Sequence, residues 1–68
     1  MDIAERVALA RFWYHANMTS VVNVANQLHI LSDERAEEMN KNHTMTIVND
    51  IIPRLSKDTI RSIGKGAN

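Results

Sequence analysis

The chain has 68 residues, enough for one domain at most, and its eight basic and eight acidic residues give a formal net charge of zero. It contains no cysteine, which excludes disulfide bonds and thiolate metal sites. A neutral chain creates no overall field that attracts nucleic acid or an anionic membrane. Because a single core of this size supplies only about 3–5 kcal/mol, we expect very good helix packing or self-association to support the fold.

No apolar run is long enough to span a membrane, and the first residues lack the basic and apolar parts of a signal peptide. We therefore expect a cytoplasmic protein with no membrane partner. The pattern predicts one helical domain over residues 1–64 and a flexible C-terminal tail over residues 65–68.

The first predicted helix runs from Asp2, a candidate N-terminal cap, to about Ile30. Apolar residues recur along it at alternating spacings of four and three, which is a heptad pattern. Its members are Ile3, Val7, Ala10, Tyr14, Asn17, Val21, Val24, Leu28 and Leu31. Because Thr19 or Ser20 can also cap a helix, a kink or a break near residues 18–20 stays an alternative.

A second helix is predicted to begin after Ser32, with acidic residues in its first turns. Its apolar stripe consists of Ala36, Met39, His43, Ile47 and Ile51. Pro53 ends this helix and favours extended backbone at Ile52. Ser56 is expected to cap a short third helix from Lys57 to Ile63, with Gly64 as its stop.

The short turn between the first two helices predicts an antiparallel hairpin. With the heptad stripe turned inward, Leu28 would meet Ala36 and Val21 would lie near His43. Asn17 would then bond Thr46 or His43, or else face water. We predict an all-α fold, an antiparallel helical hairpin with a short third helix, that pairs into a homodimeric helical bundle.

Apolar surface is in excess at one end of this hairpin. Phe12, Trp13 and Tyr14 are consecutive, and one helix contact cannot bury three side chains that point about a hundred degrees apart. We expect the excess to form the dimer interface, made of Leu9, Phe12, Ala16, Met45, Val48 and Ile52. For a larger protein partner, we expect the contact residues to be Arg11, Phe12, Trp13 and His15. The alternative is a monomer in which the third helix covers all of this apolar surface.

No catalytic, metal or cofactor site is expected. The three histidines are fourteen residues apart, whereas two helical metal ligands need a spacing of three or four. His43 is predicted to be hydrogen-bonded inside the hairpin, and His15 and His29 to be solvated. No glycine-rich loop is present to hold a phosphate, and the serines look like helix caps rather than nucleophiles.

A nucleic-acid function is the alternative. Residues 24–32 loosely resemble the first helix and turn of a helix-turn-helix motif, although His29 stands where that motif usually has glycine. Asp33 and Glu34 would face phosphates in such a complex. A second route is a basic edge made of Arg54, Lys57, Arg61 and Lys65. The hairpin also resembles, in architecture alone, small plasmid-encoded RNA-binding helical dimers.

The sequence therefore favours a small non-enzymatic regulator or inhibitor that binds a larger protein, of the kind that phages and plasmids encode. A small nucleic-acid-binding regulator is the second hypothesis.

Overall fold

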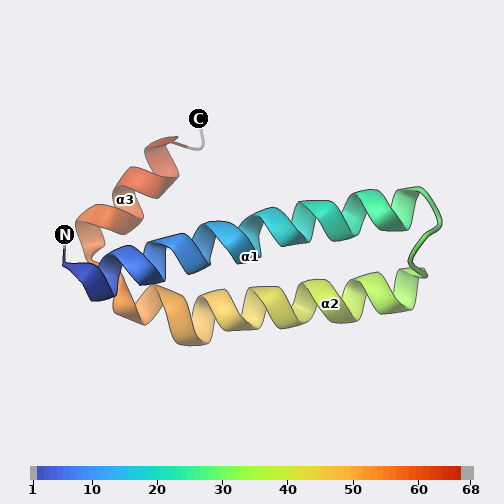
Figure 1. Ribbon diagram of the computed structural model, residues 1–68, viewed down its shortest axis with the longest axis horizontal. Coiled ribbons are helices and arrows are strands. Elements are labelled where there is room, and N and C mark those ends of the chain that lie inside the picture. Colours follow the sequence, from blue (N-terminus) through green and yellow to red (C-terminus); the bar gives the residue numbers. More distant parts are fainter. Residues whose placement is uncertain (1, 67–68) are drawn as a thin grey trace.

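The structure is a computed structural model that describes residues 2–66. It has three α-helices and no strand within that range, which confirms the predicted all-α class (Figure 1). The two long helices lie side by side and antiparallel, and the third lies at the end where the chain begins. In chain order the elements are α1 (Ile3–Gln27), α2 (Asp33–Thr46), the π-helical turn η1 (Ile47–Ile51), the 3₁₀ turn η2 (Ile52–Arg54) and α3 (Lys57–Gly66).

Helix α1 begins and ends at short-range hydrogen bonds. The carboxylate of Asp2 accepts the Glu5 N–H at 2.7 Å, which caps the first turn as predicted. The helix continues without a break past residues 18–20 and stops at Gln27, three residues earlier than expected. At that point His29 has a positive φ of 60°, and the Ile30 N–H reaches the Ala25 carbonyl at 2.9 Å. The left-handed conformation of His29, together with the hydrogen bond from the Ile30 N–H to the Ala25 carbonyl, forms a Schellman motif that ends the helix.

Helix α2 is capped by Ser32, whose Oγ accepts the Arg35 N–H at 3.1 Å. The chain stays helical beyond α2 because it widens into the π turn η1 and then tightens into η2, which contains Pro53. Ile52 is therefore helical, with φ −53° and ψ −43°, and the predicted extended geometry is wrong. The missing N–H of Pro53 is accommodated by this change of winding instead of by a break.

Helix α3 is capped by Ser56, whose Oγ accepts the Thr59 N–H at 3.1 Å. It runs through Gly64 as far as Gly66, so the predicted stop at Gly64 is wrong. No described glycine has a positive φ, which is the conformation that a glycine stop uses. Residues 65–66 of the predicted tail are helical, and residues 67–68 lie outside the described part of the chain.

The core lies at the end of the hairpin where α3 joins it. Ile51 is fully buried and forms a cluster with Ala8 and Leu55. Partly buried side chains pack around that cluster, namely Leu9, Phe12, Ile47, Ile52 and Ile63. Towards the turn between α1 and α2 the buried apolar side chains are only Val22 and Ala36. The hairpin is therefore well packed at one end and thinly packed at the other.

The face of α1 that meets α2 differs from the prediction. Three polar pairs join α1 to α2, namely His15–His43, Asn23–Asn40 and Asn26–Asp33, and Arg11 joins α1 to Asp50 of η1. The heptad residues from Ile3 to Leu28 lie on the opposite face of α1 and are exposed, whereas Leu31 is partly buried. The predicted contacts of Leu28 with Ala36 and of Val21 with His43 are therefore wrong. Small and hydrogen-bonding side chains on the other face pair with α2. In α2 the predicted stripe does turn inward.

Candidate interaction surfaces

The largest unpartnered feature is an apolar stripe along the outer face of α1. We define the α1 stripe as Ile3, Val7, Ala10, Tyr14, Asn17, Val21, Val24 and Leu28, all of which are exposed. Ile3 retains 76% and Leu28 64% of their accessible surface. A helix of 25 residues is about 37 Å long, so the stripe runs the length of the molecule, whose longest extent is 40 Å.

A hollow of about 420 Å³ lies at the C-terminal end of the α1 stripe. Almost all of its exposed surface is apolar. It is lined by Ser20, Val21, Val24, Ala25, Leu28 and Ile30. Its shape gives the stripe a depression that can accept side chains from another molecule.

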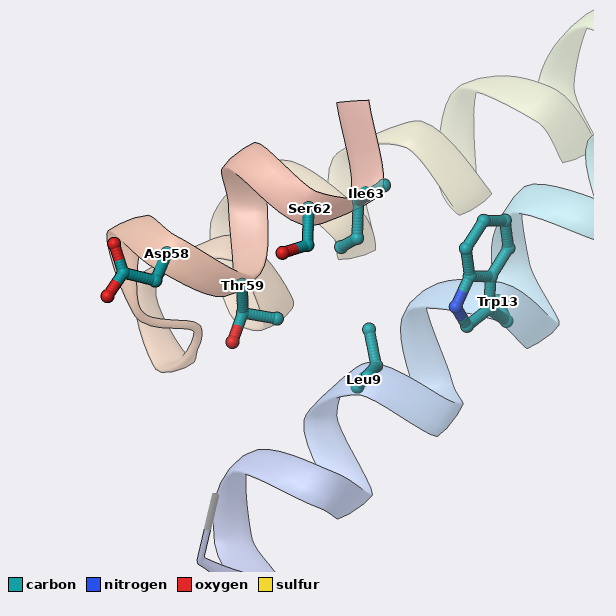
Figure 2. A pocket seen from close by; sticks show the side chains of 6 residues that line it. All are labelled: Leu9, Trp13, Asp58, Thr59, Ser62 and Ile63. Atoms are coloured by element: carbon teal, nitrogen blue, oxygen red, sulfur yellow. The ribbon is translucent and has the colours of Figure 1, made fainter. Parts of the chain in front are cut away.

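A second concave surface is the α1–α3 cleft, of about 320 Å³ (Figure 2). Leu9 and Trp13 line it from α1, and α3 contributes Asp58, Thr59, Ser62 and Ile63. Figure 2 shows Trp13 at one end of the cleft and Asp58 at the other. Trp13 is 44% exposed, and its ring meets Phe12 edge-on with centroids 5.3 Å apart. Packing against Phe12 holds the indole in place beside the opening.

One carboxylate ties α3 to α1 and so sets the width of the α1–α3 cleft. Glu5 accepts hydrogen bonds from the Ser56 N–H at 3.2 Å, from Ser56 Oγ at 3.3 Å and from Thr59 Oγ1. Thr59 is the one buried polar residue among residues 2–66, and its hydroxyl is satisfied by this contact. The position of α3 therefore depends on a polar clamp as well as on apolar packing.

The four predicted partner-binding residues have different surroundings. Arg11 donates to Asp50, and Phe12 packs against the core cluster. His15 forms a 2.8 Å hydrogen bond through Nδ1 with Nδ1 of His43, so the prediction that His15 is solvated is wrong. Helix α1 turns this face towards α2 and η1, where Arg11 and His15 find their partners. Only Trp13 presents a large part of its ring to solvent.

The predicted dimer residues are also divided. Leu9, Phe12 and Ile52 are partly buried against the core cluster, and Ala16 is partly buried. Met45 and Val48 are exposed. The part of this patch that lies on α1 is used inside the molecule, while the part on α2 and η1 is open. A dimer through this patch stays a prediction.

Two ionisable groups between the helices have shifted pKa values. Partial burial, followed by the nearby His43 and Arg11, lowers the pKa of His15. The hydrogen bond and the positive charge of Arg11 lower the pKa of Asp50, and Arg54 adds to this effect at 3.4 Å. Both shifts favour the protonation state that the helix pairing needs at neutral pH.

The nucleic-acid hypothesis has two possible surfaces in the structure. Helices α1 and α2 lie antiparallel, whereas those of a helix-turn-helix cross at about 90–120° (Figure 1). The acidic start of α2 is therefore not presented as a recognition helix. Lys57, Arg61 and Lys65 follow one another at helical spacing on α3 and form a short basic ridge. Arg61 lies 3.9 Å from Asp58, and Arg54 pairs with Asp50.

Comparison with known proteins gives no family assignment: no protein-family model, curated protein or solved structure matches this chain at a significant level. Within residues 2–66, no group of three or more histidine, cysteine or carboxylate side chains is arranged to hold a metal ion. None of the described helices combines the length and the apolar character needed to cross a bilayer. Functional reasoning therefore rests on the surfaces described above.

Two surface features are not evident from the sequence. The α1 stripe was identified as apolar from its spacing, but nothing in the spacing indicates that it faces away from α2. The hollow at its end needs the turn at Leu28 and Ile30, whose geometry depends on the positive φ of His29. Because residue 29 is histidine and not glycine, the sequence does not indicate its left-handed conformation.

Proposed function

We propose that this chain is a small non-enzymatic regulator that acts by binding a larger protein. The observation that supports this proposal is the distribution of apolar surface. Eleven large apolar side chains are exposed among residues 2–66, whereas the buried hydrophobic residues are five, two of them alanines. Exposed apolar patches of this kind usually mark sites of protein association.

The α1–α3 cleft is the proposed contact site for the larger protein. Tryptophan is enriched among residues that dominate binding energy, and Trp13 packs edge-on against Phe12 at the cleft edge. Leu9 and Ile63 form an apolar floor, and Asp58 offers a negative charge at the far end. This chemistry suits a partner segment that has a large apolar side chain near a basic group.

A quantitative capture experiment tests this function. Immobilised native chain, Trp13→Ala and the matched control Met45→Ala are each exposed to extract of the cells that produce the protein. Met45 is similarly exposed, at 49%, but lies on α2 away from the cleft. We expect one protein to be retained by the native chain and by Met45→Ala, and lost with Trp13→Ala. That protein, once purified, should bind the native chain at least about tenfold more tightly than Trp13→Ala.

Equal capture by all three forms would remove the cleft as the working surface. A nucleic-acid regulator is the second candidate, because Lys57, Arg61 and Lys65 form one basic ridge. Titration against duplex DNA and structured RNA at two salt concentrations separates the two functions, since binding through phosphates weakens steeply with salt. Binding that does not respond to salt, or no binding, would exclude the basic ridge as a nucleic-acid-binding site.

A further inference from the structure

We infer that the α1 stripe is covered by the α1 stripe of a second copy of this chain, with the two helices antiparallel. This interface is a different surface from the α1–α3 cleft, and it does not depend on the larger partner. The stripe has the spacing of a coiled-coil seam over four heptads. Helix α2 packs against the opposite face of α1 and leaves the residues of the seam exposed, and only the Tyr14 ring also meets α2, edge-on to His43 with centroids 6.4 Å apart.

The α1 stripe is self-complementary when one copy is reversed. An antiparallel register places Leu28 opposite Ile3 of the second copy, and Val24 opposite Val7 of the second copy. In the next layer the larger Val21 meets the smaller Ala10 of the second copy. The two-fold axis of the pair generates a second, identical copy of each of these layers.

The central layer explains the one polar residue in the stripe. Asn17 lies opposite Tyr14 of the second copy in this register, so the phenolic hydroxyl can pair with the amide. A buried amide needs such a partner, and a polar residue in a coiled-coil seam is known to fix register. Both residues are exposed in the single chain and have no hydrogen bond between them there.

The hollow at the end of the stripe fits the same arrangement. It is lined by Val21, Val24 and Leu28 together with residues that flank them. In the antiparallel register Ile3 and Val7 of the second copy project towards it. An apolar depression of about 420 Å³ can receive these two side chains, of which Ile3 is 76% and Val7 54% exposed in the single chain.

The charges beside the stripe favour the antiparallel orientation. In a parallel pair, Arg6 of one copy would lie beside Arg11 of the other, and this contact, which the ion pair of Arg11 with Asp50 weakens, would occur twice. In the antiparallel pair Arg6 lies beside Gln27 and Arg11 beside Met18 of the second copy. Neither contact opposes like charges, so the reversed orientation has the lower electrostatic cost.

The charges at the two ends of the molecule favour the same orientation. The start of α2, at the turn end, carries Asp33, Glu34, Glu37 and Glu38 against a single Arg35. Helix α3 lies at the other end and carries Lys57, Arg61 and Lys65 against Asp58 (Figure 1). Reversing one copy brings the acidic end of each chain to the basic end of the other. A parallel pair would place acid beside acid and base beside base.

A charge-reversal experiment on the full chain tests both the interface and its orientation. Molar mass is measured by sedimentation equilibrium over a range of concentrations for the native chain, Val7→Glu, Val24→Lys and the double variant. We expect a native dimer whose dissociation constant rises by about tenfold or more in each single variant. The double variant should regain dimerisation, because residues 7 and 24 face each other and form two Glu–Lys pairs.

Each alternative outcome has a defined meaning. A native chain that is monomeric at all concentrations would overturn the inference while leaving capture through Trp13 intact. A dimer that is lost in both single variants and not regained in the double variant would overturn the antiparallel orientation. A dimer that is indifferent to these variants but lost with Val48→Glu would place the interface on the other exposed face. Circular dichroism of each variant confirms that the helices persist.

Disulfide trapping gives an independent reading of orientation, since the native chain has no cysteine. Val7→Cys combined with Val24→Cys should form covalent dimers under mild oxidation. The two sites are about 25 Å apart along one helix, so they cannot join within a chain. Val7→Cys alone should form no covalent dimer under the same conditions. Efficient trapping by the single variant would instead show a parallel pair.

Discussion

Nδ1 of His15 on α1 lies 2.8 Å from Nδ1 of His43 on α2, so the two imidazoles join the helices near the middle of the hairpin. One ring must donate the Nδ1–H and the other must accept it, which requires at least one neutral ring. The rings are 5.0 Å apart between centroids, and Tyr14 stacks edge-on against His15. The pair is therefore a contact between helices that depends on pH.

The first prediction concerns stability in weak acid. Folding lowers the pKa of His15 below its ordinary value of 6.5, so the unfolded chain takes up a proton more readily than the folded chain. The stability that this group contributes is complete above pH 6.5 and falls as the pH drops from there towards the lowered pKa. Urea unfolding between pH 8 and pH 5 should show this decline. The decline in the free energy of unfolding should be smaller in His15→Asn. An unchanged dependence on pH in that variant would refute the assignment of the decline to His15.

The second prediction concerns the core. Ile51 is fully buried in η1 and contacts the cluster of Ala8 and Leu55. Ile51→Ala should cost about 2–5 kcal/mol, because it removes buried methyl groups and leaves a cavity. In a chain with so small a core, this loss should abolish most cooperative thermal unfolding. Met45→Ala is the matched control, since Met45 is 49% exposed, and it should change the stability by less than about 0.5 kcal/mol.

The third prediction concerns the clamp on α3. Glu5→Ala removes the acceptor for the Ser56 and Thr59 hydrogen bonds, which should loosen α3 while the hairpin remains folded. Amide hydrogen exchange in residues 57–66 should then become faster, and that in α2 should stay unchanged. Hydrogen bonds to a charged group contribute about 1.5–3 kcal/mol, so exchange should rise by at least about tenfold. Glu34→Ala is a control on an exposed carboxylate, and equal effects from both variants would argue against the clamp.

The fourth prediction concerns the turn between α1 and α2. His29 has a φ of 60°, a conformation in which a side chain with a Cβ is disfavoured and glycine is not. His29→Gly should therefore raise the free energy of unfolding, by about 0.5–1 kcal/mol, as read from urea titration at pH 8. His29→Val should lower it, because β-branched residues tolerate this region worst. The opposite ranking of the two variants would mean that the turn has another conformation in solution.

Local features of the fold could be predicted from the sequence because their causes are local. Asp2, Ser32 and Ser56 were predicted as caps, and each has a side-chain oxygen that accepts an N–H of the following turn. The inward stripe of α2 was also correct, since most of its outward positions are charged or amide residues that are costly to bury. The antiparallel direction of α2 relative to α1 was predicted from the short turn between them.

The orientation of α1 could not be predicted in the same way. Its face with Ala8, His15 and Val22 looks less apolar than the α1 stripe, yet this face meets α2. The pairing of His15 with His43 and of Asn23 with Asn40 depends on residues far apart in the chain. Apolar spacing indicates which face of a helix is suited to burial, but not which element lies against it. Several of the predicted partner and dimer residues lie on the face that meets α2, and their roles stay predictions.

The position of Trp13 beside the α1 stripe has a geometric consequence for recognition. In the antiparallel dimer proposed above, a two-fold axis perpendicular to the paired helices would bring both α1–α3 clefts to the same side, with the two indoles close to its centre. Such a dimer would be bivalent on one side. A target that is itself two-fold symmetric, or that repeats its binding segment, would engage both clefts at once, and its avidity would exceed the affinity of either cleft alone.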